Sequence, residues 1–377
     1  MCRFTRFYYK STINHNVHKM RIHYPALDGL RGLAIIGVIL SHNFSWIPNF
    51  HYFQYGVDLF FVISGFLITE ILLSSRNHKN YFYNFYMKRI FRIFPLYYFT
   101  LVLFILVIYL LPQFRPQYNY YISHISFLLF HFQNWLPIIH PPPQEAMILN
   151  HYWSLSIEEQ FYLLSPFLIF LIPDFKKLCY VFITLILCAI LYRLAIWALV
   201  QPGNTKYLLH HFTRIDGICA GSLIAVYRYS GQKKIKAIID TCCKYFIIIY
   251  AILFAAIKIL KWNIPHFNIL GYTSISIIFA FITLKCLHNH SALYKIFNNK
   301  ILSFFGRISY GLYLYHFPIL LLSNIYLSRM GFQLSKITII NNLLFSLTTV
   351  ALAIILSYFS FKYFELPILK KRESFIR

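Results

Sequence analysis

Long apolar runs recur along the chain, and short polar segments separate them. A helix needs about 20 apolar residues to cross the hydrocarbon core of a bilayer, so runs of this length predict membrane spans. We expect an all-α, polytopic membrane bundle of about ten helices. Their approximate ranges are 27–46, 57–74, 94–112, 154–172, 179–200, 212–227, 245–260, 268–287, 308–327 and 338–361.

Residues 113–153 do not fit this pattern clearly. They contain an apolar stretch that is followed by Pro137 and by the triplet Pro141-Pro142-Pro143. We interpret the segment as a long non-cytoplasmic loop with a re-entrant or interfacial helix, because proline is better tolerated in a wet cavity than in lipid. An eleventh span is the alternative.

The composition excludes a soluble enzyme of one or two domains. Charged residues make up 12% of the 377 residues, against about 25% in soluble domains. Such a chain cannot coat a globular surface with polar groups. We expect a basic N-terminal tail at 1–24, one membrane domain at 25–365 and a C-terminal tail at 366–377, with Met20 as an alternative start to Met1.

The net charge of +24 would suggest nucleic acid as the partner of a soluble protein. Here the basic residues cluster between the apolar runs, as the positive-inside rule predicts. With the N-terminus in the cytoplasm, most of the 35 lysines and arginines fall on the inner side. We therefore expect both termini in the cytoplasm, a lipid bilayer as partner and no nucleic acid.

The seven cysteines are scattered and show no CxxC or Cys/His spacing. The sequence therefore predicts neither a disulfide framework nor a bound metal.

Arg31 and His42 are polar residues within the first predicted span. A charge at the bilayer centre costs about 2.5–3.5 kcal/mol, so it needs a partner or a watery cavity. Eleven residues of helix place the two side chains on one face within about 20° and about 16.5 Å apart along the axis. The alternative is that Arg31 pairs with Asp28 at the interface and that His42 is merely interfacial.

Asp58 begins the second span on the outer side, where His42 is also expected. A neighbouring carboxylate could orient the imidazole and raise its basicity. The alternative is an acidic residue that stabilises a helix N-terminus.

Arg89 and Arg92 lie on the inner side in the sequence KRIFRIFP. Their i,i+3 spacing places both on one helix face, where they can bind phosphate oxygens together. The alternative is ordinary positive-inside charge.

The sequence HYWSLSIEEQFYLL opens the fourth span at its outer end. Two carboxylates and an amide are hard to explain as lipid-facing groups, and Glu158 lies one helical turn beyond Ser154. The alternative is a helix cap with acidic residues in its first turn. We take Glu158 as a candidate catalytic residue and Trp153, Ser154 and Gln160 as candidate substrate-binding residues.

Two weaker polar signals lie further along the chain. Arg214 and Asp216 open the sixth span, and His316 precedes Pro318 in the ninth. A kinked helix that lines a cavity fits this pattern, and so does a core histidine with its hydrogen bonds satisfied. We include Arg214, Asp216 and His316 among the candidate substrate-binding residues.

Taken together, these motifs resemble the acyltransferase-3 family of membrane proteins, which O-acylates sugars of the bacterial envelope. The resemblance covers residues from about 25 to 370. It rests on the ordered segments LDGLRGLAIIGVILSH, GVDLFFVISGFLIT, KRIFRIFPLYY, HYWSLSIEEQFYLL, GRISYGLYLYHFPI and YFELPILK.

The resemblance implies about ten helices in the bacterial inner membrane and acyl transfer from cytoplasmic acyl-CoA to a sugar hydroxyl at the outer face. Acetyl is the family's default acyl group, and polysaccharide, lipopolysaccharide and peptidoglycan are candidate acceptors. Arg31 and His42 are implied to be required, and Arg89 and Arg92 to help hold the donor. Acyl-CoA is thereby a substrate, and no permanently bound cofactor is implied. Some members carry a C-terminal SGNH-type domain, which this sequence lacks, so transfer without it or with a separate protein is expected.

The mechanism that we expect uses His42 as general base, oriented by Asp58 or Glu158. Arg31 lies along the path of the pantetheine arm or stabilises the oxyanion. Direct transfer is the simpler route, although an acyl-enzyme is an alternative.

There are two competing functions. One is a transporter or flippase for lipid-linked sugars, which internal repeats would favour, and we find no such repeats in the sequence. The other is a structural membrane subunit. The sequence leaves the oligomeric state open.

Overall fold

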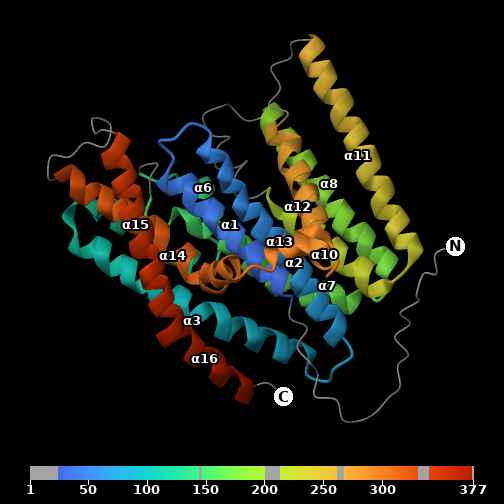
Figure 1. Cartoon of the computed structure of the whole chain (residues 1–377), viewed down its shortest axis with the longest axis horizontal. Helices are drawn as coiled ribbons and strands as arrows, with labels where there is room; N and C mark the ends of the chain where they lie inside the picture. Colours follow the sequence, from blue (N-terminus) through green and yellow to red (C-terminus); the bar gives the residue numbers. More distant parts are fainter. Residues whose placement is uncertain (1–23, 144–146, 200–212, 261–266, 330–338, 376–377) are drawn as a thin grey trace.

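The computed structural model describes residues 24–143, 147–199, 213–260, 267–329 and 339–375 (Figure 1). Within these ranges the chain is helical and contains no β-strand. The predicted all-α class is therefore confirmed. The predicted tail at 1–24 lies, apart from Tyr24, outside the described residues.

Each of the ten predicted spans overlaps one of the longer helices. These helices are α1 (Pro25–Asn43), α2 (Gly56–Ser75), α3 (Tyr81–Leu110), α7 (Trp153–Leu171), α8 (Phe175–Leu199), α10 (Ile215–Ser230), α11 (Lys233–Leu260), α12 (Tyr272–Cys286), α14 (Lys300–Arg329) and α15 (Ile339–Ser360).

Seven helical stretches of the described chain are long and apolar enough to cross a membrane. They are Pro25–Asn43, Phe50–Ser75, Tyr81–Leu110, Phe175–Leu199, Lys233–Ile257, Ile269–Cys286 and Ile339–Lys371. The lengths and compositions of these helices thus indicate a multi-pass membrane protein, while the exact number of spans stays a prediction.

The ambiguous segment 113–153 forms short helical pieces. In the part that the structure describes, its longest helix has nine residues, which gives a rise of about 13.5 Å, too short to cross the hydrocarbon core of about 30 Å. The structure therefore contradicts an eleventh span there. The pieces are η2 (Pro112–Phe114), α4 (Arg115–Ser123), α5 (Ile125–Leu129), α6 (Leu136–Ile139) and η3 (Asn150–Tyr152).

Shorter elements connect or extend the long helices. They are η1 (Phe50–Tyr55), η5 (Phe267–Gly271), α13 (Ala292–Phe297), η7 (Phe361–Glu365), α16 (Leu366–Lys371) and η8 (Arg372–Phe375).

Two helix pairs at the centre of the bundle pack at backbone distance. A Cβ atom added at Gly32 of α1 would collide with the carbonyl oxygen of Leu302 in α14, and one added at Gly65 of α2 would collide with that of Ile218 in α10. Small residues permit this close packing of membrane helices. The α1–α14 pair carries Arg31 and Tyr313 of the candidate site.

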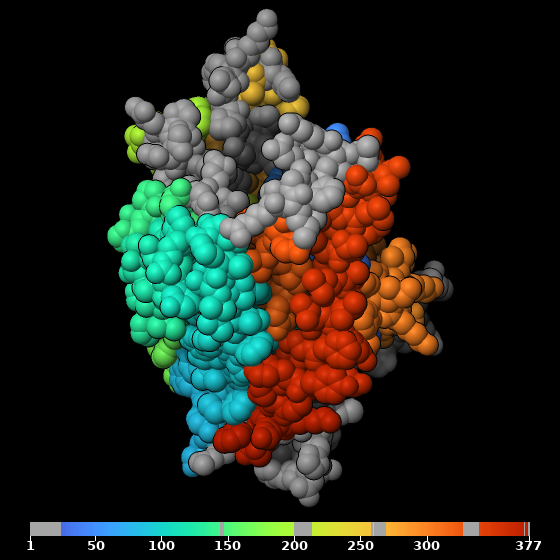
Figure 2. Space-filling view, turned by 90° about the vertical axis from the view of Figure 1, so that its left-hand side faces the viewer, coloured from blue at the N-terminus to red at the C-terminus, as the bar shows by residue number. Residues whose placement is uncertain are grey.

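The outer face formed by α3 and α15 is apolar. In Figure 2, α3 lies beside α15 and α16 over one side of the molecule. Val102 and Leu110 on α3 are each 65% exposed, and Leu344 on α15 is 55% exposed. An exposed apolar face of this extent is typical of a lipid-facing surface.

Candidate active site

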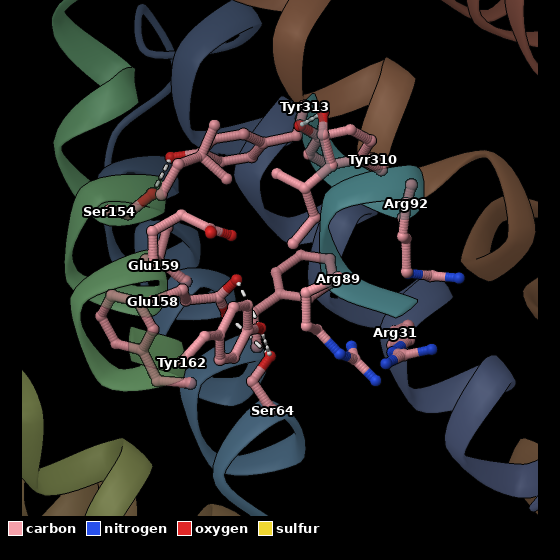
Figure 3. A pocket seen from close by; sticks show the side chains of 16 residues that line it. Arg31, Ser64, Arg89, Arg92, Ser154, Glu158, Glu159, Tyr162, Tyr310 and Tyr313 are labelled. Carbon is pink, nitrogen blue, oxygen red and sulfur yellow. Dashed lines mark hydrogen bonds between the residues drawn. The ribbon is translucent and has the colours of Figure 1, made fainter. Parts of the chain in front are cut away.

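Five helices surround a polar pocket inside the bundle (Figure 3). Arg31 comes from α1, Ser64 from α2, Arg89 and Arg92 from α3, and the remaining polar groups come from α7 and α14. Those groups are Ser154, Glu158, Glu159, Tyr162, Ser309, Tyr310 and Tyr313.

Three arginines form the cationic side of the pocket. Figure 3 shows Arg31, Arg89 and Arg92 on the side opposite the two glutamates. The Arg89 guanidinium lies 5.7 Å from the ring centroid of Tyr162, and its buried Nε has no hydrogen-bond partner in the described chain. Arg31 Nη1 lies 3.9 Å from Asp28, at the limit of an ion pair. These guanidiniums therefore retain donors for an anionic ligand such as a phosphate.

Glu158 belongs to the opposite wall of the same pocket. Its Oε1 accepts a hydrogen bond from Ser64 Oγ at 2.8 Å, and its Oε2 accepts one from the Tyr162 hydroxyl at 3.2 Å. The structure thus gives the carboxylate two partners inside the pocket. It does not support the predicted role of Glu158 in orienting His42, because His42 pairs elsewhere.

Ser154 and Tyr313 close the pocket on the side of α7 and α14. Their hydroxyl oxygens are 2.5 Å apart, and the Tyr313 hydroxyl also donates to the backbone carbonyl of His151 at 2.8 Å. The ring centroid of Tyr313 lies 5.7 Å from that of His316 and 5.5 Å from that of His151. Tyr313 therefore contacts both the pocket and a group of histidines behind it.

These histidines are His42, His151 and His316, which we call the histidine cluster. His42 Nδ1 lies 2.9 Å from His316 Nε2, and the two rings stack with centroids 5.2 Å apart. The ring centroids of His151 and His316 are 5.5 Å apart. His42 is therefore oriented by a second imidazole, and the prediction that Asp58 or Glu158 orients it is wrong in this structure.

A proline in α14 leaves one backbone carbonyl unpaired in the helix, and this carbonyl binds His151. Pro318 has no backbone N–H, so the carbonyl four residues earlier, that of Leu314, has no helical partner. His151 Nε2 lies 3.3 Å from this carbonyl oxygen. His151 Nδ1 is buried and makes no hydrogen bond to the described residues. The cluster therefore contains a buried imidazole nitrogen with no hydrogen-bond partner among the described residues.

Asp58 forms a buried ion pair instead of contacting His42. Its Oδ1 and Oδ2 accept hydrogen bonds from Arg214 Nε and Nη2 at 2.9 and 2.6 Å. Both side chains are buried. The bidentate pair joins α2 to the start of α10, so the geometry favours a structural role for both residues over the predicted catalytic and substrate-binding roles.

Asp216 forms a second buried ion pair, with Arg193 of α8. Its Oδ2 accepts from Arg193 Nη1 and Nη2 at 3.0 Å each and from the Thr273 hydroxyl at 2.8 Å. These contacts join α8, α10 and α12. Asp216 therefore lies in a structural network and does not line the pocket, contrary to its expected place in a substrate site.

Two further candidates also lie outside the pocket lining. Gln160 Nε2 donates to the carbonyl of His131 and to Asn134 Oδ1, each at 2.9 Å, so it anchors the loop before α7. Trp153 packs its ring against Phe61, with centroids 6.2 Å apart. Of the predicted substrate-binding residues, Ser154 alone lines the pocket, and His316 belongs to the histidine cluster.

Within the described ranges, no group of three or more His, Cys, Asp or Glu side chains is arranged to hold a metal ion.

Sequence reasoning missed His151, Tyr162 and Tyr313 as site residues. All three lie within the quoted motifs. Aromatic residues are common at the membrane interfaces, so their residue type alone did not mark them as site residues. The sequence signal for His151 was Pro318, which leaves the carbonyl of Leu314 without a helical partner. This signal pointed to His151 only once the structure showed that α14 packs near α7.

A family model described as an acyltransferase domain matches residues 24–361 of this chain. The chain belongs to this acyltransferase family. The match extends from the start of α1 to the end of α15 and so includes every residue of the pocket and of the histidine cluster. The resemblance inferred from the motifs is thereby confirmed.

Two relatives within this acyltransferase group are named for O-acetyl transfer. The chain is 31% identical over 378 residues to the peptidoglycan O-acetyltransferase OatA of Listeria monocytogenes, covering 93% of this chain and 56% of the relative. It is 30% identical over 364 residues to the O-acetyltransferase OatA of Staphylococcus aureus, covering 92% and 57%. The chain therefore spans little more than half the length of these relatives. No solved structure matches it.

Proposed function

We propose that this chain is a membrane O-acetyltransferase that moves an acetyl group from cytoplasmic acetyl-CoA to a hydroxyl of an envelope saccharide. Family membership and the names of the relatives support the acyltransferase class. The observation that carries the proposal is that α1 links an arginine-lined pocket, through Arg31, to an imidazole eleven residues further on, His42.

The geometry of α1 and the arginines of the pocket support acetyl-CoA as the donor. Arg89 and Arg92 bind the phosphates of acetyl-CoA, and the pantetheine arm runs along α1 past Arg31. The helical rise from Arg31 to His42 is about 16.5 Å, which is on the order of the length of that arm. The acyl carbon reaches His42 after the Ser154–Tyr313 pair separates, because Tyr313 lies between the pocket and the histidine cluster.

The chemical step is a direct acyl transfer. His42 takes the proton from the acceptor hydroxyl as that oxygen attacks the thioester carbonyl. The new C–O bond forms and the C–S bond breaks. His42 then gives the proton to the thiolate sulfur of CoA. Arg31 contributes positive charge on the donor side. The name of the Listeria relative makes a peptidoglycan sugar the first acceptor to test, ahead of polysaccharide and lipopolysaccharide.

The test is transfer of isotope-labelled acetyl from acetyl-CoA to saccharide by the full chain reconstituted in vesicles. We expect a mass increase of one acetyl group on peptidoglycan fragments, and its loss in the His42→Ala variant. The His288→Ala variant, which alters an exposed histidine at the end of α12, is the control and is expected to keep the activity. Near-normal transfer by His42→Ala would contradict the assignment of the base.

The same measurement addresses the competing transporter function. A flippase changes the amount of saccharide on the far side of the vesicle without changing its mass. Saccharide movement without a mass increase would therefore favour transport over acyl transfer.

A further inference from the structure

His316 is anchored by its own helix through one ring nitrogen. Its Nδ1 lies 2.8 Å from the carbonyl oxygen of Tyr313 and 3.1 Å from that of Leu312. A carbonyl oxygen can only accept a hydrogen bond, so Nδ1 must carry the proton. Because the ring is buried and a charged imidazolium is costly there, the neutral form is favoured, and its Nε2 then carries a lone pair.

The state of His42 follows from that of His316. His42 Nδ1 lies 2.9 Å from His316 Nε2. Since His316 Nε2 is the acceptor, His42 Nδ1 must donate, and neutral His42 then carries its lone pair on Nε2. We propose, on the basis of the proposed function, that His316 is the positioning residue that fixes His42 in the tautomer with an unprotonated Nε2, the atom that removes the proton from the acceptor hydroxyl.

The packing around the pair holds this arrangement in place. The Phe317 ring meets His42 at 5.1 Å and His151 at 5.4 Å, centroid to centroid. Among the described residues, His316 from α14 lies against His42, and His151 from the turn before α7 lies against His316 and interacts electrostatically with His42. Asp58 of α2 and Glu158 of α7, the acidic residues first considered as partners of His42, hydrogen-bond elsewhere.

A neutral imidazole is a suitable partner at this position. In Ser-His-Asp triads a buried carboxylate accepts the Nδ1–H of the catalytic histidine and fixes its tautomer. A carboxylate in the membrane would add a buried charge at a cost of about 2.5–3.5 kcal/mol, which a neutral acceptor avoids. His316 accepts the same hydrogen bond before and after His42 takes the proton, so it changes neither its own proton count nor the balance of the reaction.

The proposal is tested by three substitutions at His316, measured as the pH dependence of acetyl transfer by the reconstituted chain. His316→Leu fills the space without an acceptor, and we expect kcat to fall about 100-fold with KM for acetyl-CoA unchanged. His316→Gln offers a carbonyl oxygen as acceptor, and we expect it to retain activity to within about tenfold. His288→Gln is the exposed control.

His316→Glu separates positioning from packing. A carboxylate beside His42 stabilises the imidazolium, so the acidic limb of the pH–kcat profile moves to higher pH. If the side chain at position 316 did not contact the base, the carboxylate would leave this limb in place. Nitrogen-15 NMR of the detergent-solubilised protein checks the tautomer directly: we expect a proton on His42 Nδ1 in the original chain and on Nε2 in His316→Leu.

Loss of the proposed function and loss of the positioning role of His316 would give different results. If the unsubstituted chain does not transfer acetyl, the proposed function is wrong. If it does, but His316→Leu keeps its kcat, or His316→Glu leaves the pH profile unchanged, the positioning role of His316 is overturned.

Discussion

Arg89 illustrates how a buried charge is kept available for a ligand. Its guanidinium packs on the rings of Phe85 and Tyr162 at 5.8 and 5.7 Å, and its Nε makes no hydrogen bond in the described chain. Arg193 and Arg214, in contrast, are held by aspartates. A guanidinium held on aromatic faces can still use its N–H groups for a phosphate.

We expect Arg89→Ala to raise KM for acetyl-CoA about tenfold or more, because one charge-assisted contact to phosphate contributes about 1.5–3 kcal/mol. Titration of labelled acetyl-CoA against the reconstituted chain measures this. Arg115→Ala is the matched control, since Arg115 is exposed and also packs on aromatic rings, those of Tyr109 and Tyr118. Equal KM values for the two variants would remove Arg89 from the donor site.

Residues within one helix were predictable, and partners on different helices were not. Helical periodicity placed Arg31 and His42 on one face of α1, which the structure contains as one helix. The partner of His42 is 274 positions away in sequence, and that of Asp58 is 156 positions away. Hydrophobic periodicity gives no information about such pairs, because it does not tell which helices are neighbours.

At the scale of elements, the apolar runs of the sequence predicted the positions of the helices correctly. They predicted the first residues of the helices less well. α3 begins at Tyr81 and α14 at Lys300, well before the predicted starts at 94 and 308. The early turns of both helices carry polar and basic residues, which lower the apolar signal without preventing a helix. As a result, Arg89 and Arg92 lie on a continuous helix with the membrane-spanning part of α3 and point into the pocket.

The close crossing of α2 and α10 brings Asp58 and Arg214 together, and it depends on glycine. We expect Gly65→Ala to lower the melting temperature of the detergent-solubilised protein, since overpacking costs about 1–3 kcal/mol and the new methyl group meets the Ile218 backbone. Gly37→Ala is the matched control on α1, because its new methyl group would lie 3.1 Å from the Phe53 carbonyl oxygen, whereas that of Gly65→Ala would collide with the Ile218 carbonyl oxygen. Equal melting temperatures for the two variants would show that the α2–α10 contact relaxes freely.

For the whole molecule, the direction of transfer depends on orientation in the membrane. The pocket arginines and the histidine cluster lie toward opposite ends of α1, since Arg31 is in its second turn and His42 in its last. With the N-terminus in the cytoplasm, the arginines face the side of the proposed donor and the histidines face the side of the proposed acceptor. The distribution of lysine and arginine predicts this orientation.

Single cysteines in a cysteine-free variant test that orientation in intact cells. Tyr52 in η1 and Asn77 after α2 are both exposed and flank α2. We expect a membrane-impermeant maleimide to label Tyr52→Cys and to label Asn77→Cys only after the cells are opened. The reverse pattern would place the histidine cluster on the cytoplasmic side. The donor and acceptor ends of the proposed mechanism would then be exchanged, and transfer of acetyl from cytoplasmic CoA to an external sugar would no longer fit this structure.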